Sequence, residues 1–413
     1  MDIFETIESN VRSYCRNYPE KFDKAKNEFI YSIDGREYID FLSGSGALNY
    51  GHNNDFIKNR IIEYLHYDGI IHGLDMFTKV KEEFIEAFTQ NVLIKNNLDY
   101  KIQFCGPTGT NAVEASLKLA RKYTKRQNII AFMGAFHGMT LGSLSVTSNK
   151  EYRSTLNGLN NTIFIPFPDH KISNENVIMY LEKILYDNHS GIDKPAAIIM
   201  ETVQAEGGIN VADIEFLKNI ENICKENEII FICDEIQVGC GRTGNFFSFE
   251  RAGIKPDLVT VSKSISGFGL PMAILLIKPS LDVWEPGEHK GTFRGNQLAF
   301  KAAVASLNYR EKENIEKQVF EKELYIKKFL MNLKQYDNSI DIRGIGMIWG
   351  IDLSNLNCAK LIQKECFKKD LIIETSGRKG NVLKILPPLN ISYDSLQRGL
   401  IIIEESIKKV LFN

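Results

Sequence analysis

Short apolar runs recur between residues 51 and 300, and they alternate with segments whose apolar positions follow helical spacing. A short apolar run bounded by polar residues is typical of a strand that is buried on both faces. Strands that alternate with helices indicate a mostly parallel sheet covered by helices. The runs that predict strands lie at residues 129–132, 162–166, 196–200, 229–233, 258–262 and 272–277.

The two ends of the chain have a different pattern. Apolar and polar residues alternate at 29–33 and 37–41, on either side of Asp34-Gly35. This pattern is a strong signal for a β-hairpin. Residues 309–335 predict one long amphipathic helix with an apolar side made of Ile315, Val319, Ile326, Leu330 and Leu333. A strand at 347–351 and a helix at 394–411 are expected after it.

These patterns divide the chain into three parts. We expect residues 1–50 to form an N-terminal segment whose hairpin joins the small domain. Residues 51–305 are expected to form a large α/β domain, and residues 306–413 a smaller α+β domain.

Composition excludes several classes of protein. The 413 residues carry a net charge of −2, so nothing global indicates nucleic acid or an anionic membrane surface as a partner. No apolar run approaches the roughly 18 residues of a membrane span. The seven cysteines form no CxxC pair, which suits reduced thiols and no metal site. Together with the polar N-terminus, this indicates a cytoplasmic protein.

Asp234 and Lys263 each follow a predicted core strand, at residues 229–233 and 258–262. In an open α/β sheet, ligands bind at the edge where such strands end. A lysine there can form a Schiff base with an aldehyde cofactor, and an aspartate can keep a pyridine nitrogen protonated, as pyridoxal phosphate chemistry requires. Taken alone, the pair is better explained by a surface lysine and a strand-end aspartate.

A glycine-rich segment, 106–114, joins a predicted strand to a predicted helix. Gly109 would let the backbone approach an anion, and Thr110 and Asn111 add side-chain donors at the helix start. The segment is either a phosphate cradle or an ordinary strand–turn–helix joint. It is no P-loop, because Gly-Lys-Ser/Thr does not follow.

Four other residues could complete such a site. Phe136 could stack on a cofactor ring beside His137, although a core phenylalanine next to a satisfied histidine has the same pattern. Glu206 precedes two glycines that could bend its loop into a site, or it belongs to a plain polar loop. Gln237 could donate to a phenolic oxygen of the cofactor.

Taken together and in this order, the motifs resemble the class III (subgroup II) aminotransferases of fold type I, over nearly the whole chain. The resemblance is carried by Asp234-Glu-Ile-Gln-Val-Gly, Ser262-Lys263 and Gly291-Thr292-Phe293-x-Gly295-Asn296. It implies an α/β fold with a mostly parallel seven-stranded sheet, a smaller α+β domain, and pyridoxal 5'-phosphate as the cofactor.

The resemblance also implies roles for individual residues. Lys263 would form the Schiff base and carry protons, and Asp234 would pair with the pyridine nitrogen. Gly109, Thr110 and Asn111 would hold the phosphate, Phe136 would stack on the ring next to His137, and Gln237 would contact the phenolic oxygen. Thr292 would reach the phosphate bound in a neighbouring subunit, which implies a homodimer or a dimer of dimers.

Further segments indicate a substrate pair. Residues 11–16, 46–54, 72–76, 106–114 and 136–140 are similar to family members that move an amino group from L-glutamate to L-aspartate 4-semialdehyde. Their products are 2-oxoglutarate and L-2,4-diaminobutyrate, which supplies ectoine, siderophore or peptide synthesis. The expected reaction is reversible and ping-pong.

Two positions depart from relatives that act on ornithine or 4-aminobutyrate. Those relatives carry an arginine at the position of Met139, and another at the position of Lys384 that pairs with the glutamate matching Glu206. We expect Glu206 and Lys384 to bind substrate, either as a pair that opens and closes or as a static pair. Another ω-aminotransferase is the alternative function, and a non-catalytic relative that only binds is a remote one.

Overall fold

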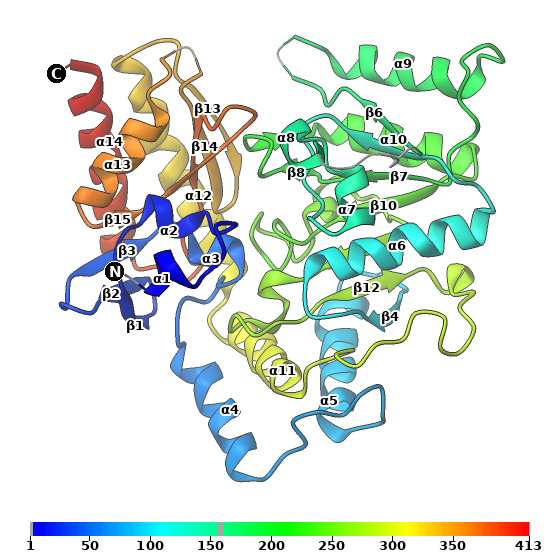
Figure 1. Ribbon diagram of the computed structural model, residues 1–413, viewed down its shortest axis with the longest axis horizontal. Helices are drawn as coiled ribbons and strands as arrows, with labels where there is room; N and C mark the ends of the chain where they lie inside the picture. Colours follow the sequence, from blue (N-terminus) through cyan, green and yellow to red (C-terminus); the bar gives the residue numbers. More distant parts are fainter. Residues whose placement is uncertain (1–2, 155–160, 170, 355, 413) are drawn as a thin grey trace.

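The computed structural model describes residues 3–154, 161–169, 171–354 and 356–412 (Figure 1). A seven-stranded sheet forms the centre of the large domain, in the order β4-β12-β11-β10-β7-β5-β6. Only β12 runs against its neighbours in this sheet, so the expected mostly parallel α/β fold is confirmed. The strands are β4 Lys101–Phe104, β12 Ile274–Ile277, β11 Leu258–Val261, β10 Ile230–Asp234, β7 Ala197–Met200, β5 Ile129–Phe132 and β6 Thr162–Ile165.

Both faces of this sheet are covered, which explains the continuous apolar runs. In β10, Phe231 and Cys233 pack into one hydrophobic cluster, whereas Ile230 and Ile232 pack into another. The first cluster holds residues of α5 Lys79–Phe88, α9 Asn174–Tyr186, α10 Ile214–Glu226 and α11 Gln297–Lys312. The second holds residues of α6 Gly109–Thr124. Because successive strand residues point to opposite faces, both sets must be apolar.

A second core lies in the small domain, at the left of Figure 1. Its antiparallel sheet has the order β13-β14-β17-β16, with β13 Asp341–Ile345, β14 Ile348–Asp352, β17 Val382–Ile385 and β16 Glu374–Ser376. Helices α12 Ile315–Met331, α13 Ala359–Lys368 and α14 Tyr393–Phe412 contribute apolar residues to the same core.

The N-terminal hairpin is confirmed as β2 Phe29–Ser32 and β3 Glu37–Asp40. The sequence pattern missed β1 Phe22–Lys26, which pairs with β2, and β15 Leu371–Ile372, which pairs in parallel with β3. The hairpin thereby joins a strand that is more than 300 residues away in the chain.

The single helix predicted at 309–335 is wrong. Residues up to Lys312 end α11, and α12 begins at Ile315. Between them, Asn314 has a φ of 49°, a left-handed conformation that asparagine adopts more easily than most residues. The apolar side was correctly placed, since Ile315, Val319, Ile326, Leu330 and Leu333 are all buried.

The remaining elements are short or connect the two cores. They are α1 Ile3–Thr6, α2 Tyr14–Asn17, α3 Ser43–Gly46, α4 Asp55–His66, α7 Leu141–Val146, α8 Lys150–Arg153, β8 Val203–Gln204 and β9 Asn210–Val211. Non-α helical turns span Thr89–Ile94, Ser248–Ala252, Lys263–Ser266, Pro279–Leu281 and Asn332–Gln335. Among the described helices, none combines the length and apolar character that crossing a membrane requires.

Arg242, in the loop after β10, ties the two domains together. Its guanidinium is fully buried and donates to the carbonyl oxygens of Met347 and Pro387 and to the side-chain oxygen of Asn49. Burial lowers the pKa of Arg242 to about 9. One side chain therefore satisfies three segments that would otherwise hold unpaired buried acceptors.

We expect Arg242→Met to lower the free energy of unfolding by about 3 kcal/mol, because three buried acceptors lose their donor at about 1 kcal/mol or more each. Urea unfolding followed by circular dichroism measures the change. The exposed Arg398→Met is the control and should change it by less than about 1 kcal/mol. Equal stability of the two variants would contradict the role of Arg242 as a clamp.

Candidate active site

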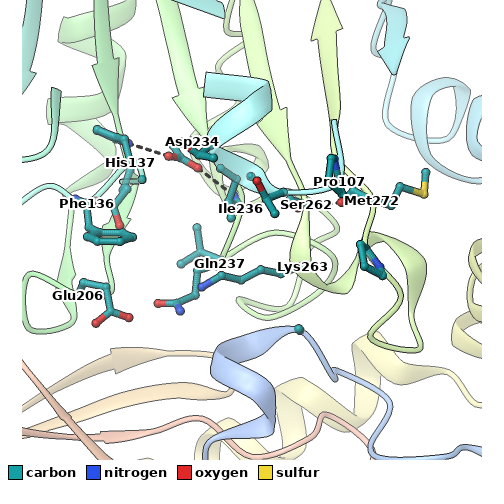
Figure 2. Close-up of a pocket in the computed structure, with 18 of the residues that line it drawn as sticks. Pro107, Phe136, His137, Glu206, Asp234, Ile236, Gln237, Ser262, Lys263 and Met272 are labelled. Carbon is teal, nitrogen blue, oxygen red and sulfur yellow. Dashed lines mark hydrogen bonds and ion pairs between the residues drawn. The ribbon is translucent and has the colours of Figure 1, made fainter. Parts of the chain in front are cut away.

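A cavity of about 360 Å³ lies where β10 and β11 end (Figure 2). It brings together eight residues that the sequence singled out, although they come from five separate segments of the chain. They are Gly109, Thr110, Phe136, His137, Glu206, Asp234, Gln237 and Lys263. The expectation that polar residues at the strand ends converge is met, as parallel strands require.

Asp234 is the last residue of β10 and is held by two donors. Its Oδ2 lies 2.6 Å from Nδ1 of His137, and its Oδ1 accepts from the backbone N–H of Ile236 at 3.0 Å. Burial opposes a charge on His137, but the bond to Asp234 and the charges of Asp234 and Glu201 raise its pKa. The bond orients a buried carboxylate at the cavity wall.

Two further carboxyl groups lie buried beside this pair. Glu201 accepts from the backbone N–H groups of Phe136 at 3.1 Å and Ala205 at 3.3 Å. Burial raises the pKa of Glu201 to about 7. Glu235 accepts from the backbone N–H of Ser248 at 2.8 Å, and burial raises its pKa to about 7 as well.

Lys263 opens the helical turn after β11 with a φ of 49°. This left-handed conformation is uncommon for lysine and is a strain typical of functional sites. Burial lowers the pKa of Lys263, which favours the neutral amine. Its Nζ donates to the carbonyl oxygen of Ser45 at 2.9 Å. A neutral amine in a cavity is suited to attack a carbonyl carbon.

Sequence reasoning missed the turn at Ser43–Gly46. Its four residues have φ angles of 49°, 58°, 57° and 83°, so the chain stays left-handed over a full turn. The turn presents the carbonyl oxygen of Ser45, which also accepts from the side-chain amide of Gln237 at 2.9 Å. The alternation Ser-Gly-Ser-Gly was the available signal, because glycine adopts this conformation without strain.

The N-terminus of α6 is the candidate phosphate site. Gly109 and Thr110 line the cavity, and the first N–H groups of a helix suit an anion. A Cβ at Gly109 would lie 2.8 Å from the side chain of Ile236, so any larger residue there would force that side chain to shift. Asn111 is not among the lining residues, because its side-chain oxygen accepts from Thr108 as a cap.

Glu206 and Lys384 do meet, and a third residue joins them. Nζ of Lys384 lies 2.6 Å from a carboxylate oxygen of Glu206 and 2.6 Å from one of Glu374. We call these three residues the charge cluster. Burial opposes ionisation of Lys384, but the two carboxylates outweigh it and raise its pKa. Burial likewise opposes the charge on Glu206, but Lys384 and Lys263 lower its pKa.

Glu374 was not predicted, and only one signal pointed to it. It is a carboxylate that follows the apolar run Leu371-Ile372-Ile373. A charge at the end of a buried strand was the same signal that singled out Asp234.

Two positions that the sequence singled out, Thr292 and Met139, lie outside the cavity. Thr292 lines a separate hollow together with Lys81, Trp284 and His289. Met139 is half exposed and does not line the cavity, so no side chain from that position enters it. Within the described residues, no cluster of His, Cys, Asp and Glu has the arrangement of a metal site.

The fold and this lysine–aspartate site are those of one class of proteins, and sequence comparison identifies the family. Residues 13–407 match the family model described as Aminotransferase class-III. A diaminobutyrate–2-oxoglutarate transaminase of Sporosarcina pasteurii is 50% identical over all of this chain and 97% of its own length. One from Bordetella parapertussis is 48% identical, covering all of this chain and 96% of its own. The chain therefore belongs to the class III aminotransferase family.

Solved structures show the same fold. An S-selective transaminase from an Arthrobacter species superposes with a TM-score of 0.88 at 22% identity, covering 99% of this chain and 97% of its own. The ornithine aminotransferase of Toxoplasma gondii has a TM-score of 0.84, also at 22% identity. This match covers 98% of this chain and 93% of the Toxoplasma chain. These likenesses confirm the fold-type I architecture.

The cofactor of the family, pyridoxal 5'-phosphate, fits the residues that are present. Two buried polar atoms of residues lining the cavity, Nε2 of His137 and Oε1 of Gln237, have no hydrogen-bond partner within the protein. A carboxylate, a lysine amine whose pKa is lowered by burial, and a helix N-terminus line the same cavity. This donor set matches a cationic ring, an aldehyde and a phosphate.

Glu235 makes the stability depend on pH. Its pKa rises from 4.5 to about 7 on folding, so the folded state binds the proton more tightly. Its contribution is full below pH 4.5 and is lost as the pH rises towards 7. Relative to Glu235→Gln, the wild type should lose about 3 kcal/mol between pH 4.5 and 7.5.

Urea unfolding at several pH values tests this expectation. The exposed Glu226→Gln is the control, and its profile should run parallel to that of the wild type. Parallel profiles for Glu235→Gln and the wild type would show that Glu235 does not titrate in this range.

Proposed function

We propose that the chain is a diaminobutyrate–2-oxoglutarate transaminase, which moves an amino group between L-glutamate and L-aspartate 4-semialdehyde. The observation that carries the proposal is the charge cluster beside Lys263, since Glu206 lines the cavity and the cation of Lys384 lies directly behind it. Relatives with this name match the full length of the chain at 48–50% identity.

The substrates need charges of both signs. Glutamate presents a distal carboxylate, which requires a cation. Aspartate 4-semialdehyde and diaminobutyrate react at the far carbon and so present an ammonium and a carboxylate together. Lys384 can serve the carboxylate and Glu206 the ammonium, because charge-assisted hydrogen bonds require an opposite charge on each ligand group.

The proposed cofactor roles rest on the geometry of six residues. Asp234, oriented by His137, would face the pyridine nitrogen, and Phe136 would stack on the ring. Gly109 and Thr110 would hold the phosphate at the start of α6. Gln237 lies beside Lys263, where its side-chain amide donates to the carbonyl oxygen of Ser45, and the same amide N–H group would contact the phenolic oxygen.

The chemistry then divides between cofactor and chain. When bound, pyridoxal phosphate supplies a cationic ring that accepts electrons released from a carbon–hydrogen bond. Lys263 would hold the cofactor through its amine, and its free amine would be the general base that moves the proton at the reacting carbon. Burial lowers the pKa of this amine, which favours the neutral form that both tasks require. Ser45 positions the amine through its carbonyl oxygen.

The alternative substrates are less well supported. No cation enters the cavity from position 139, where relatives acting on ornithine or 4-aminobutyrate carry arginine. The cation at position 384 is a lysine, a point charge without the bidentate fork of arginine. A cavity with one shared lysine thus favours a substrate that brings its own ammonium.

The assembly and the compartment are part of the proposal. Thr292 lies in a hollow apart from Lys263, and this separation supports a homodimer in which Thr292 would serve the cofactor phosphate of a second copy. Phe77 and Phe293 are fully or largely exposed, and an interface would cover such side chains. All seven cysteines are free of disulfide bonds, which supports a location in the cytoplasm.

The direct test follows the visible absorbance of the lysine-bound cofactor. Glutamate should remove the band, aspartate 4-semialdehyde should restore it, and succinic semialdehyde should restore it far more slowly. Lys263→Ala should lack this cycle, because no side-chain amine bonds the cofactor. Restoration by succinic semialdehyde alone would exclude the proposed substrate, and a wild type without the band would exclude the enzyme.

Glu206 should affect the two half-reactions differently. Glu206→Ala removes a partner of the diaminobutyrate ammonium and leaves Lys384 more open to the glutamate carboxylate. We expect the KM for diaminobutyrate to rise roughly tenfold, the effect of about 1.4 kcal/mol, while the KM for glutamate stays the same or falls. The exposed Glu215→Ala is the control. Equal changes in both constants would show a static pair.

A further inference from the structure

The two carboxylates of the charge cluster are held in very different ways. Glu374 lies in β16 directly opposite Lys384 in β17, so the register of the sheet fixes the pair. Glu206 lies in the loop between β8 and β9, next to Gly207 and Gly208. The two carboxylates share one cation, but only one of them is held by a strand.

Exposure separates the two carboxylates in the same way. The side chain of Glu206 is 33% exposed and lines the cavity, whereas Glu374 is 9% exposed and Lys384 is 0% exposed. Glu206 therefore covers Lys384 from the cavity side, and its side chain can leave Lys384 without breaking a strand pair. Glu374 is packed behind Lys384 and stays in place when Glu206 leaves.

The charge count of the cluster follows from this arrangement. With both carboxylates ionised, Lys384 leaves a net charge of −1. When Glu206 swings away, Lys384 and Glu374 remain as a neutral pair. A carboxylate that enters then meets a neutral pair with an anion behind it, while an ammonium meets two anions and one cation. Charges this close interact strongly inside a protein.

We propose that Glu374 is a specificity residue that disfavours dicarboxylates and favours substrates bearing an ammonium at the cluster. The inference rests on the proposed function, because it assigns glutamate and diaminobutyrate to the same cavity. Glu374 acts through Lys384 and through its own charge, without lining the cavity.

The test measures binding, so it does not depend on turnover. Borohydride reduction of the holoenzyme fixes the cofactor to Lys263 and prevents amino transfer. Isothermal titration then gives the Kd of glutarate, a dicarboxylate, and of L-2-aminobutyrate, which carries the ammonium and carboxylate of diaminobutyrate without its reacting amine. The quantity compared is the ratio of the two Kd values.

Glu374→Gln should shift this ratio about tenfold towards glutarate, because the repulsion of a carboxylate and the attraction of an ammonium both weaken. Ser376→Ala is the matched control, since Ser376 is buried two residues further along β16 and carries no charge. Its ratio should equal that of the wild type. If Glu374→Gln does not fold, Glu374→Ala gives the same comparison.

Each outcome decides the inference. A shift of fivefold or more towards glutarate supports it. A smaller shift, an opposite one, or an equal loss of both ligands overturns it and leaves Glu374 as a structural partner of Lys384. The half-reactions test the proposed function separately. If aspartate 4-semialdehyde does not restore the absorbance band but the Kd ratio still shifts, only the assignment of the substrate is excluded.

Discussion

Burial of β10 and β11 on both faces is the constraint on which the site depends. Each strand packs against one hydrophobic cluster on one face and another on the other, so its interior positions are almost all apolar, and Thr260 of β11 is the polar exception. The first positions open to chemistry are the strand ends, where Asp234 and Lys263 lie. Because the two strands are parallel neighbours, those ends share one edge of the sheet.

Charge placed at that edge has to be balanced within the protein. Asp234 is paired with His137, and Lys384 with two carboxylates, because an isolated buried charge is very costly. Glu201 and Glu235 are buried without a cation at hydrogen-bond distance, and for that reason their pKa values rise towards 7. The buried groups are therefore of two kinds: charges that an ion pair holds in place, and carboxyl groups that gain or lose a proton near pH 7.

Several features followed from local pattern and were confirmed. The strand runs, the β2–β3 hairpin and the helix that follows the glycine-rich segment 106–114 depend on residues close together in the chain. The break at Asn314 was missed because the helical periodicity continues across it. The β3–β15 pairing was missed because it joins residues over 300 positions apart, and such pairing leaves no local trace.

The sequence by itself determined which residues could do the chemistry: a lysine and an aspartate after core strands, and a glycine turn before a helix. Tertiary structure decided which of them meet. It brought Glu206 to Lys384, added Glu374 across a strand pair and Ser45 from a left-handed turn, and kept Thr292 and Met139 apart from the cavity. The physical reason is that a segment forms a strand or a helix according to the residues near it in the chain. Which distant side chains it meets is set by the packing of the whole chain.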